Sequence, residues 1–239
     1  MLTKRWARKA PTRVLFLEFF AGERVLSQEA RARGVAVAKP EDLATGGLDL
    51  ASHDGLAKAM RKIKNFAGRC RTLVVHLAPP CASFSKVRDQ PHKTRLRSAE
   101  HPAGLPELLP QQQQLADVGN ACAEATIKLA QLVSSLGGVA TVENPHGSYL
   151  WTLVAPWCTT PYVDVVMDQC RYGTTWRKRT IWRCWGDAAP ELNKSCGISK
   201  GGSLVCGLQR HVTLEFGGAS TKAAAAYPPR VGAAYAKML

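Results

Sequence analysis

The sequence predicts an α/β protein built on a doubly wound, mostly parallel β-sheet. Short apolar runs of strand length alternate along the chain with segments whose apolar residues recur at helical spacing. This alternation is typical of parallel strands joined by helices that cross over on the two faces of a sheet. The chain has 239 residues, 46% of them hydrophobic, which is enough for one such domain with a substantial core.

The pattern begins with a strand, a helix and a second strand. Residues 13–20 form a short apolar run rich in Leu and Phe, which predicts a buried strand. Residues 21–34 carry a helical apolar stripe that ends at Gly34, a common stop signal. Residues 35–38 (VAVA) predict the second strand.

A second helix and a third strand follow, and then a long connection. Asp54 can cap a helix over 55–65, and the apolar run at 72–78 predicts the third strand. Residues 86–110 hold charges and four prolines, which predicts a long mobile loop. The longest helix is expected over 111–136, and three more strands at 139–144, 163–167 and 179–185.

The charge of the chain indicates a polyanionic partner. Its net charge is +14, from 32 basic and 18 acidic residues, and the basic residues concentrate at 4–13, 86–97 and 171–185. The last segment interleaves them with rings that can stack on bases, namely Tyr172, Trp176, Trp182 and Trp185. No apolar stretch approaches the roughly 20 residues of a membrane span, and no apolar core of a secretory signal follows the basic start. We therefore expect a nuclear or cytoplasmic protein that binds nucleic acid.

Polar or flexible residues follow several predicted strands, at the sheet edge where ligands bind in this kind of fold. In EFFAG (18–22), Gly22 allows a tight turn beside a cofactor. Asp42 lies 20 residues further on, the spacing of a carboxylate that binds ribose hydroxyls. Asp49 is a similar candidate, and for both acids the alternative is a surface residue or a helix cap.

Two further segments carry candidate catalytic groups. In PPCASFS (79–85) the prolines end a strand and leave Cys81 at the sheet edge, where Lys86 and Arg88 could favour its thiolate. The alternative is an inert cysteine. In TVENP, Glu143 ends another strand and could act as a general acid. Its alternative is a structural carboxylate paired with an arginine.

Taken in order, these segments resemble the signatures of the cytosine carbon-5 DNA methyltransferases. EFFAG is similar to that family's Asp-Leu-Phe-Ala-Gly, and PPCASFS to its Pro-Pro-Cys with Phe-Ser following. The ENP at 143–145 is similar to Glu-Asn-Val, and YGTTWRKRT (172–180) to Tyr-Gly-Val-Pro-Gln followed by arginines. The matches span residues 14–185, and their combination is fairly specific.

The resemblance implies a Rossmann-like fold, a cofactor and a mechanism. Cys81 would attack carbon 6 of a cytosine flipped out of DNA, and Glu143 would hydrogen-bond the base at N3. Arg177 and Arg179 would steady the base or its phosphate. The cofactor S-adenosylmethionine would be held by Phe20, Gly22, Asp42, Asp49 and Pro80. The substrate would be contacted by Ser85, Lys86, Arg88 and Asn144.

The chain departs from the family pattern at several positions. Glu23 and Arg24 follow the glycine where small residues are usual, and Arg24 could crowd the cofactor. Trp176 stands where the family has Gln, and Pro145 where it has Val. A short insert replaces the usual target-recognition region, so target specificity would be poor or supplied by a partner protein. RNA as substrate stays open, as does an inactive methyltransferase-like module that binds nucleic acid, such as part of a mobile element.

The expected organisation follows from these assignments. It is a basic arm at 1–12, a catalytic domain at 13–186, the insert at 187–226 and a short terminal helix at 227–239. The eight cysteines include no C-x-x-C pair, so we predict reduced thiols and no metal site. The alternative is a zinc site in or near the insert, formed by Cys184, Cys196, Cys206 and His211.

Overall fold

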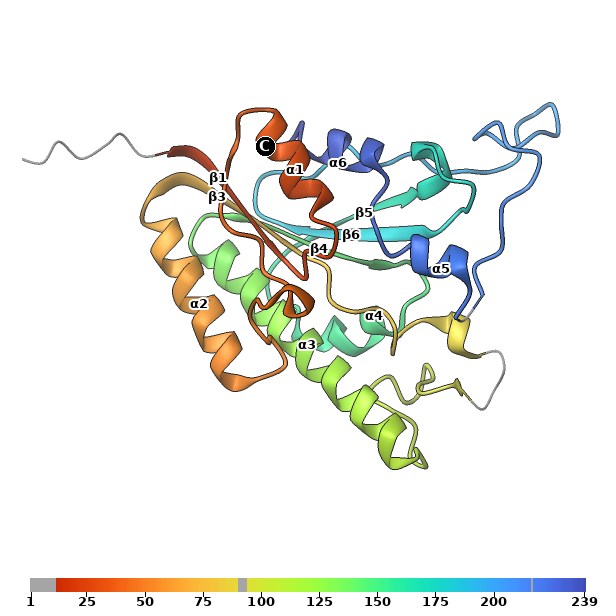
Figure 1. Ribbon diagram of the computed structural model, residues 1–239, viewed down its shortest axis with the longest axis horizontal. Coiled ribbons are helices and arrows are strands. Elements are labelled where there is room, and N and C mark those ends of the chain that lie inside the picture. The colour runs from red at the N-terminus through yellow and green to blue at the C-terminus, as the bar shows by residue number, and fades with distance from the viewer. Residues whose placement is uncertain (1–11, 90–93, 216) are drawn as a thin grey trace, which may run out of the picture.

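A six-stranded sheet forms the centre of the computed structural model, which describes residues 12–89, 94–215 and 217–239 (Figure 1). The strand order is β2-β1-β3-β4-β6-β5. The strands are β1 Thr12–Phe19, β2 Ala36–Val37, β3 Cys70–Leu77, β4 Val139–Pro145, β5 Val163–Asp168 and β6 Arg179–Trp185. The first four pair in parallel, whereas β6 runs antiparallel to both β4 and β5. The predicted α/β class with a mostly parallel sheet is confirmed.

Helices cover both faces of the sheet, as expected of a doubly wound fold (Figure 1). The helices are α1 Val25–Ala32, α2 His53–Ala67, α3 Pro110–Ser135, α4 Tyr149–Val154, α5 Ala219–Ala223 and α6 Pro229–Tyr235. On one face α2 and α3 bury residues such as Ile63 and Leu129 against the sheet. On the other, α1 and α6 pack together and bury Leu26 and Val231. Each face therefore has its own apolar core.

Two helix starts differ from the predictions. The helix expected over 21–34 begins at Val25, because Gly22 and Arg24 have positive φ angles and form a turn. The cap of α2 is Ser52, whose Oγ accepts a hydrogen bond from the Gly55 N–H at 3.0 Å. Asp54, the predicted cap, lies in the first turn of α2 and forms a surface ion pair with a lysine one turn later.

The regions outside the sheet include the insert and both ends of the predicted organisation. In 187–226 the only described helix is α5, and a small hairpin forms where Ile198 bridges Leu204. The predicted terminal helix is present as α6. Residues 1–11 of the predicted basic arm lie outside the described residues. Among the helices described, none combines the length and the apolar character that crossing a bilayer requires.

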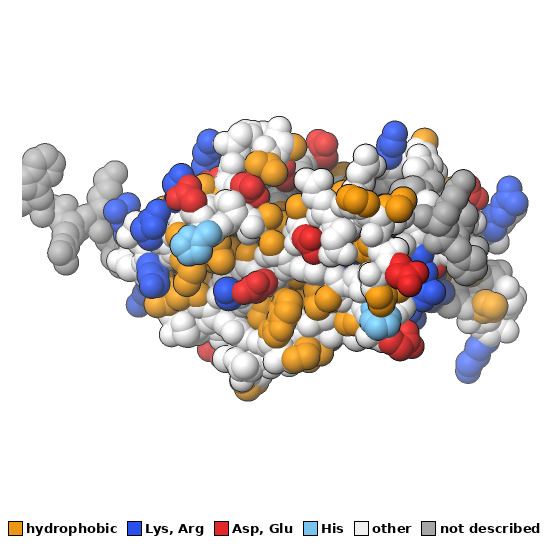
Figure 2. All heavy atoms as spheres, turned by 90° about the horizontal axis from the view of Figure 1, so that it is seen from below, with side chains coloured by type: hydrophobic (Ala, Val, Ile, Leu, Met, Phe, Trp, Pro, Cys, Tyr) orange, Lys and Arg blue, Asp and Glu red, His pale blue; other side chains and the backbone are white. Residues whose placement is uncertain are grey.

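Figure 2 shows the molecule from below, turned by 90° from the view of Figure 1. Basic side chains lie mainly toward the two ends of this face, and acidic side chains lie among them. The basic excess is therefore not gathered into one continuous patch on this side of the molecule.

Candidate active site

The carboxyl ends of β1 and β3 meet at a topological switch point. These strands are neighbours, and the chain leaves β1 toward α1 on one face and β3 toward α3 on the other. The segments that follow them, 20–25 and 78–82, line a cavity of about 290 Å³. A ligand site is expected at this place in an open α/β sheet, because the diverging connections leave a crevice.

The predicted nucleophile and the predicted general acid both line this cavity. Cys81 follows β3, and Glu143 lies near the end of β4. Lys178, which directly precedes the antiparallel β6, joins them, with its Nζ 4.0 Å from Oε1 of Glu143. Tyr227 donates a hydrogen bond from its hydroxyl to Oε2 of Glu143 at 3.0 Å. The sequence predicted the first two residues but neither Lys178 nor Tyr227.

The Glu143 carboxylate is buried and keeps one oxygen available. Its side chain is 6% exposed, yet Oε1 accepts no hydrogen bond from any residue that the structure describes. A buried acceptor without a donor is costly, and a bound molecule with an N–H group could satisfy it. The next residue, Asn144, instead donates from Nδ2 to the Pro79 carbonyl at 3.0 Å. It braces the turn before Cys81 and lines neither cavity described here, while its buried Oδ1 accepts no hydrogen bond from the described residues, so its contact with substrate stays a prediction.

Burial raises the pKa of the Cys81 thiol above its ordinary value of 9.0. The Lys178 ammonium opposes this shift and the Glu143 carboxylate adds to it. In the free protein the thiol is therefore protonated near neutral pH, and the nearby cation is the group that stabilises its thiolate.

A second cavity of about 270 Å³ adjoins the first, and both are lined by Cys81 and Lys178. Ser85, Lys86 and Arg179, all predicted from the sequence, line this second cavity. The thiol thus lies where the two cavities meet. Three cationic side chains line the second cavity, namely Lys86, Lys178 and Arg179.

Two predicted arginines lie elsewhere. Arg177 pairs with Asp168, with 3.2 Å between Nε and Oδ1, and donates to the Cys196 carbonyl at 2.8 Å. Arg88 donates from Nε to the Thr94 carbonyl at 3.0 Å. Neither lines the two cavities, so the structure does not bring them to this site, and the roles of Arg177 at the base and of Arg88 at the substrate stay predictions.

The predicted cofactor side is present in part. Phe20, Gly22 and Pro80 line the first cavity, but Asp42 and Asp49 do not. Asp42 accepts hydrogen bonds from the Gly22 and Ala44 N–H groups, each at 2.9 Å, and so braces the glycine turn. Asp49 accepts from the N–H of residue 51 at 3.0 Å. Their contacts are those of turn and cap residues, the alternative reading of both acids.

The turn after β1 is conformationally strained. Arg24 has φ 59° and ψ 28°, in the left-handed region, and lines the first cavity as the sequence suggested. Phe20 also has a positive φ, of 53°. Gly22 has φ 46°, and an added Cβ there would meet nothing within 4 Å, so the conformation rather than lack of room calls for glycine. Strain of this kind is concentrated at functional sites.

Arg97 anchors the loop that carries Cys81, and the sequence did not reveal it. It is 1% exposed, and its guanidinium lies over the Phe84 ring at 3.9 Å from the centroid. Its five hydrogen bonds go to the Ser83 carbonyl, Ser83 Oγ, the Pro102 carbonyl, Asn120 Oδ1 and the Ala116 carbonyl. A Cβ at Gly119 of α3 would lie 2.3 Å from Ser83 Oγ, so glycine there admits the loop.

The structure brings together three of the four candidate zinc ligands and places the fourth elsewhere. Cys184 is 2% exposed, lies on β6 and packs in the core under α1 and α6. Cys196, Cys206 and His211 do lie together, and Cys170, which was not a candidate, completes the group. Cys184 is therefore not part of this group. Cys170 was missed because it lies in a short turn after β5, far from the others in sequence.

A scan of the chain against protein-family models found no match, and a search of curated proteins found none either.

Proposed function

We propose that this chain is a methyltransferase that transfers a methyl group from S-adenosylmethionine to carbon 5 of cytosine in DNA through a covalent cysteine adduct. The observation that carries the proposal is the convergence of Cys81 and Glu143 on one cavity at the β1/β3 switch point. The order of the four sequence signatures agrees with it. Under this proposal the finer fold assignment is a Rossmann-like methyltransferase fold.

The residues of the first cavity are suited to the cofactor. Phe20 and Pro80 give apolar surfaces, and the space over Gly22 is open. We propose that Phe20, Gly22 and Pro80 hold S-adenosylmethionine, which supplies the methyl group when it is bound. Asp42 contributes indirectly, because it holds the glycine turn in shape.

The chain's own residues carry the covalent chemistry. The Cys81 thiolate, stabilised by Lys178, attacks carbon 6 of the cytosine and forms a carbon–sulfur bond. Negative charge develops in the ring, and Glu143, acting as its carboxylic acid, stabilises it by donating a hydrogen bond to N3. After carbon 5 has accepted the methyl group, a water molecule takes the proton from carbon 5. The 5,6 double bond forms again and the carbon–sulfur bond breaks, which returns the Cys81 thiolate and frees the product.

The second cavity suits the flipped nucleotide. A base must leave the stack before its ring can be attacked, and a pocket beside the nucleophile must receive it. Lys86 and Arg179 line this cavity and could contact the flanking phosphates, while Ser85 shapes its wall. The net charge of +14 agrees with a nucleic-acid substrate.

Covalent trapping tests the proposal. Oligonucleotides in which 5-fluorocytosine replaces cytosine should form a denaturation-resistant adduct when S-adenosylmethionine is present, because the fluorine cannot leave as a proton does. Cys81→Ser should abolish the adduct, whereas Cys70→Ser, which removes a thiol at the start of β3, should retain it. Matched DNA and RNA oligonucleotides would identify the substrate.

One observation favours the alternative, an inactive module that binds nucleic acid. Arg24, in a strained conformation, lines the cavity where the cofactor would bind. Under this alternative, calorimetry detects no binding of S-adenosylmethionine and no adduct forms. Affinity for DNA would still fall steeply with added salt, because it would rest on phosphate contacts.

A further inference from the structure

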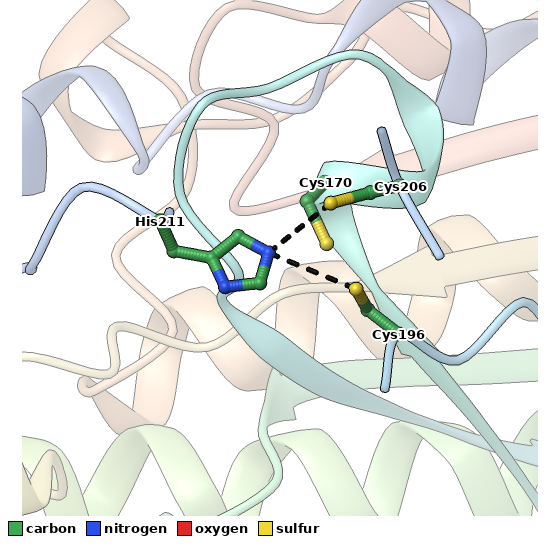
Figure 3. A group of neighbouring side chains, drawn as sticks. All are labelled: Cys170, Cys196, Cys206 and His211. Carbon is green, nitrogen blue, oxygen red and sulfur yellow. Dashed lines mark hydrogen bonds between the residues drawn. The ribbon is translucent and has the colours of Figure 1, made fainter. Parts of the chain in front are cut away.

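Four possible metal ligands converge where the insert meets the sheet (Figure 3). Cys170 lies in the turn after β5, whereas Cys196, Cys206 and His211 come from the insert. The ligand atoms of all four lie within 4.8 Å of one another. Cys170 and Cys196 are buried, and Cys206 and His211 are half-buried. Thiols and imidazole are the ligands that zinc prefers in structural sites.

The distances fit a single tetrahedral ion. Zinc bonds of about 2.3 Å to sulfur and about 2.0–2.1 Å to nitrogen place sulfur and nitrogen about 3.6 Å apart and two sulfurs about 3.8 Å apart. Nε2 of His211 lies 3.3 Å from Sγ of Cys206 and 3.7 Å from Sγ of Cys196 (Figure 3). These separations bracket the expected sulfur–nitrogen value.

The backbone positions two of the ligands on one small hairpin. Ile198 bridges Leu204, and the Val205 N–H donates to the Gly197 carbonyl at 2.9 Å, so Cys196 and Cys206 lie at the open end of the hairpin. Gly202 and Gly207, with φ of 79° and 82°, form the turns at its tip and directly after Cys206. The Val212 N–H donates to the Thr175 carbonyl and fixes the chain next to His211.

Hydrogen bonds from neighbouring residues support the group. Asp168 accepts from the Cys196 N–H at 2.6 Å, and Arg177 donates to the Cys196 carbonyl at 2.8 Å while it pairs with Asp168. Such outer contacts orient ligands in metal sites. Three thiolates and a neutral imidazole around Zn²⁺ would carry a net charge of −1, and the Arg177 guanidinium that pairs with Asp168 contacts the backbone of this group at the Cys196 carbonyl. This contact explains why Arg177 turns away from the cavities.

We propose that Cys170, Cys196, Cys206 and His211 bind one structural zinc ion, which fastens the insert to the end of β5. The insert has little regular structure in which to bury a core, and a metal site commonly replaces a core in such a segment. The proposal stands independently of methyl transfer. A two-iron cluster would share its ligands between two ions, whereas four ligand atoms this close together fit one.

The test uses the whole 239-residue chain, purified under reducing conditions without chelator. Elemental analysis should find one zinc ion per chain. Cys206→Ser should lose it, and Cys70→Ser, a half-buried thiol outside the group, should retain it. Replacing zinc with cobalt in the unmodified chain should give the intense visible bands of a tetrahedral ion and a thiolate charge-transfer band. The cobalt spectrum needs no variant, so the test survives even if Cys206→Ser does not fold.

Other outcomes would overturn the proposal. They are a folded chain that takes up neither zinc nor cobalt, the visible absorption of an iron–sulfur cluster in the purified protein, or a disulfide between two of the three cysteines after non-reducing digestion. Retention of zinc by Cys206→Ser at the level of the unmodified chain would also contradict it.

Discussion

Replacing Arg97 should destabilise the protein more than any other single change to the Cys81 loop. Arg97→Met removes the donor from five hydrogen bonds, one of them buried and four part-buried, while retaining a long apolar side chain. Each acceptor left without this donor costs about 1.5 kcal/mol. This loss in the free energy of unfolding is partly offset, because burial lowers the pKa of Arg97 from 12.5 to about 10. The lowered pKa corresponds to a cost of about 3 kcal/mol for moving the cation out of water, and the substitution removes this cost.

The net expectation is a fall of about 4 kcal/mol in the free energy of unfolding. Urea denaturation followed by tryptophan fluorescence measures it. The matched control is Arg95→Met in the same loop, where a half-exposed side chain donates one hydrogen bond to the Arg97 carbonyl. This control should lose less than about 1 kcal/mol.

The same variants report on the position of the nucleophile. Because Arg97 ties the loop to α3 through the Ala116 carbonyl and Asn120, its loss should also raise the rate at which iodoacetamide alkylates Cys81. Cys81→Ser in the Arg97→Met background identifies the reacting thiol. If Arg97→Met and Arg95→Met have equal stability, the guanidinium network does not hold the loop and the reasoning fails.

Three further changes test the strained turn, a buried acid and the carboxylate's partner. Arg24→Gly should raise the unfolding free energy by about 1 kcal/mol by relieving the left-handed strain, whereas Gln28→Gly inside α1 should lower it by about as much; a destabilised Arg24→Gly would contradict this. Burial raises the pKa of Glu18 from 4.5 to about 7, so its protonated form stabilises the fold below pH 4.5 and this contribution is lost as pH rises through 7. Urea titrations at a series of pH values measure this. Between pH 4.5 and 7 the free energy of unfolding of the unmodified protein should fall by about 3 kcal/mol more than that of Glu18→Gln. If the two free energies change with pH in parallel, the pKa of Glu18 is not raised. Tyr227→Phe removes the donor to Glu143 and should cost about 1–3 kcal/mol in thermal or urea unfolding, and an unchanged stability would show that the bond contributes nothing.

The sheet could be predicted closely because buried parallel strands are continuous apolar runs. The strand expected at 72–78 forms at Cys70–Leu77, and that expected at 139–144 forms at Val139–Pro145. The proximity of Cys81 and Glu143 could be predicted because the carboxyl ends of neighbouring parallel strands lie at one edge of the sheet. That argument uses only strand order and position, both of which leave a trace in the sequence.

Contacts between side chains that are far apart in the sequence could not be predicted in this way. The identity of the cation beside Glu143 depends on how the chain turns into β6, which places Lys178 rather than Arg177 at the cavity. Arg97 is a charged residue in a proline-rich loop, so the sequence predicts an exposed side chain. Only the structure shows that Arg97 is buried and that it has hydrogen-bond acceptors there. Cys170 lies 26 residues before Cys196, and the path of the chain through β6 and the start of the insert decides that they meet.

The insert connects the proposed zinc ion with the second cavity. Leu214 and Thr221 line that cavity together with Ser85 and Lys86, and Leu214 lies three residues after the ligand His211. A zinc ion that fixes His211 would therefore also restrict the wall against which a flipped base would lie. A long recognition domain is then not required to close the pocket, because a short segment held at one end by a metal can form its outer wall. Removal of zinc should consequently weaken trapping on 5-fluorocytosine without altering the residues that contact the thiol. If zinc-free protein trapped the base as well as the zinc-bound protein, the metal would hold the insert without shaping the pocket.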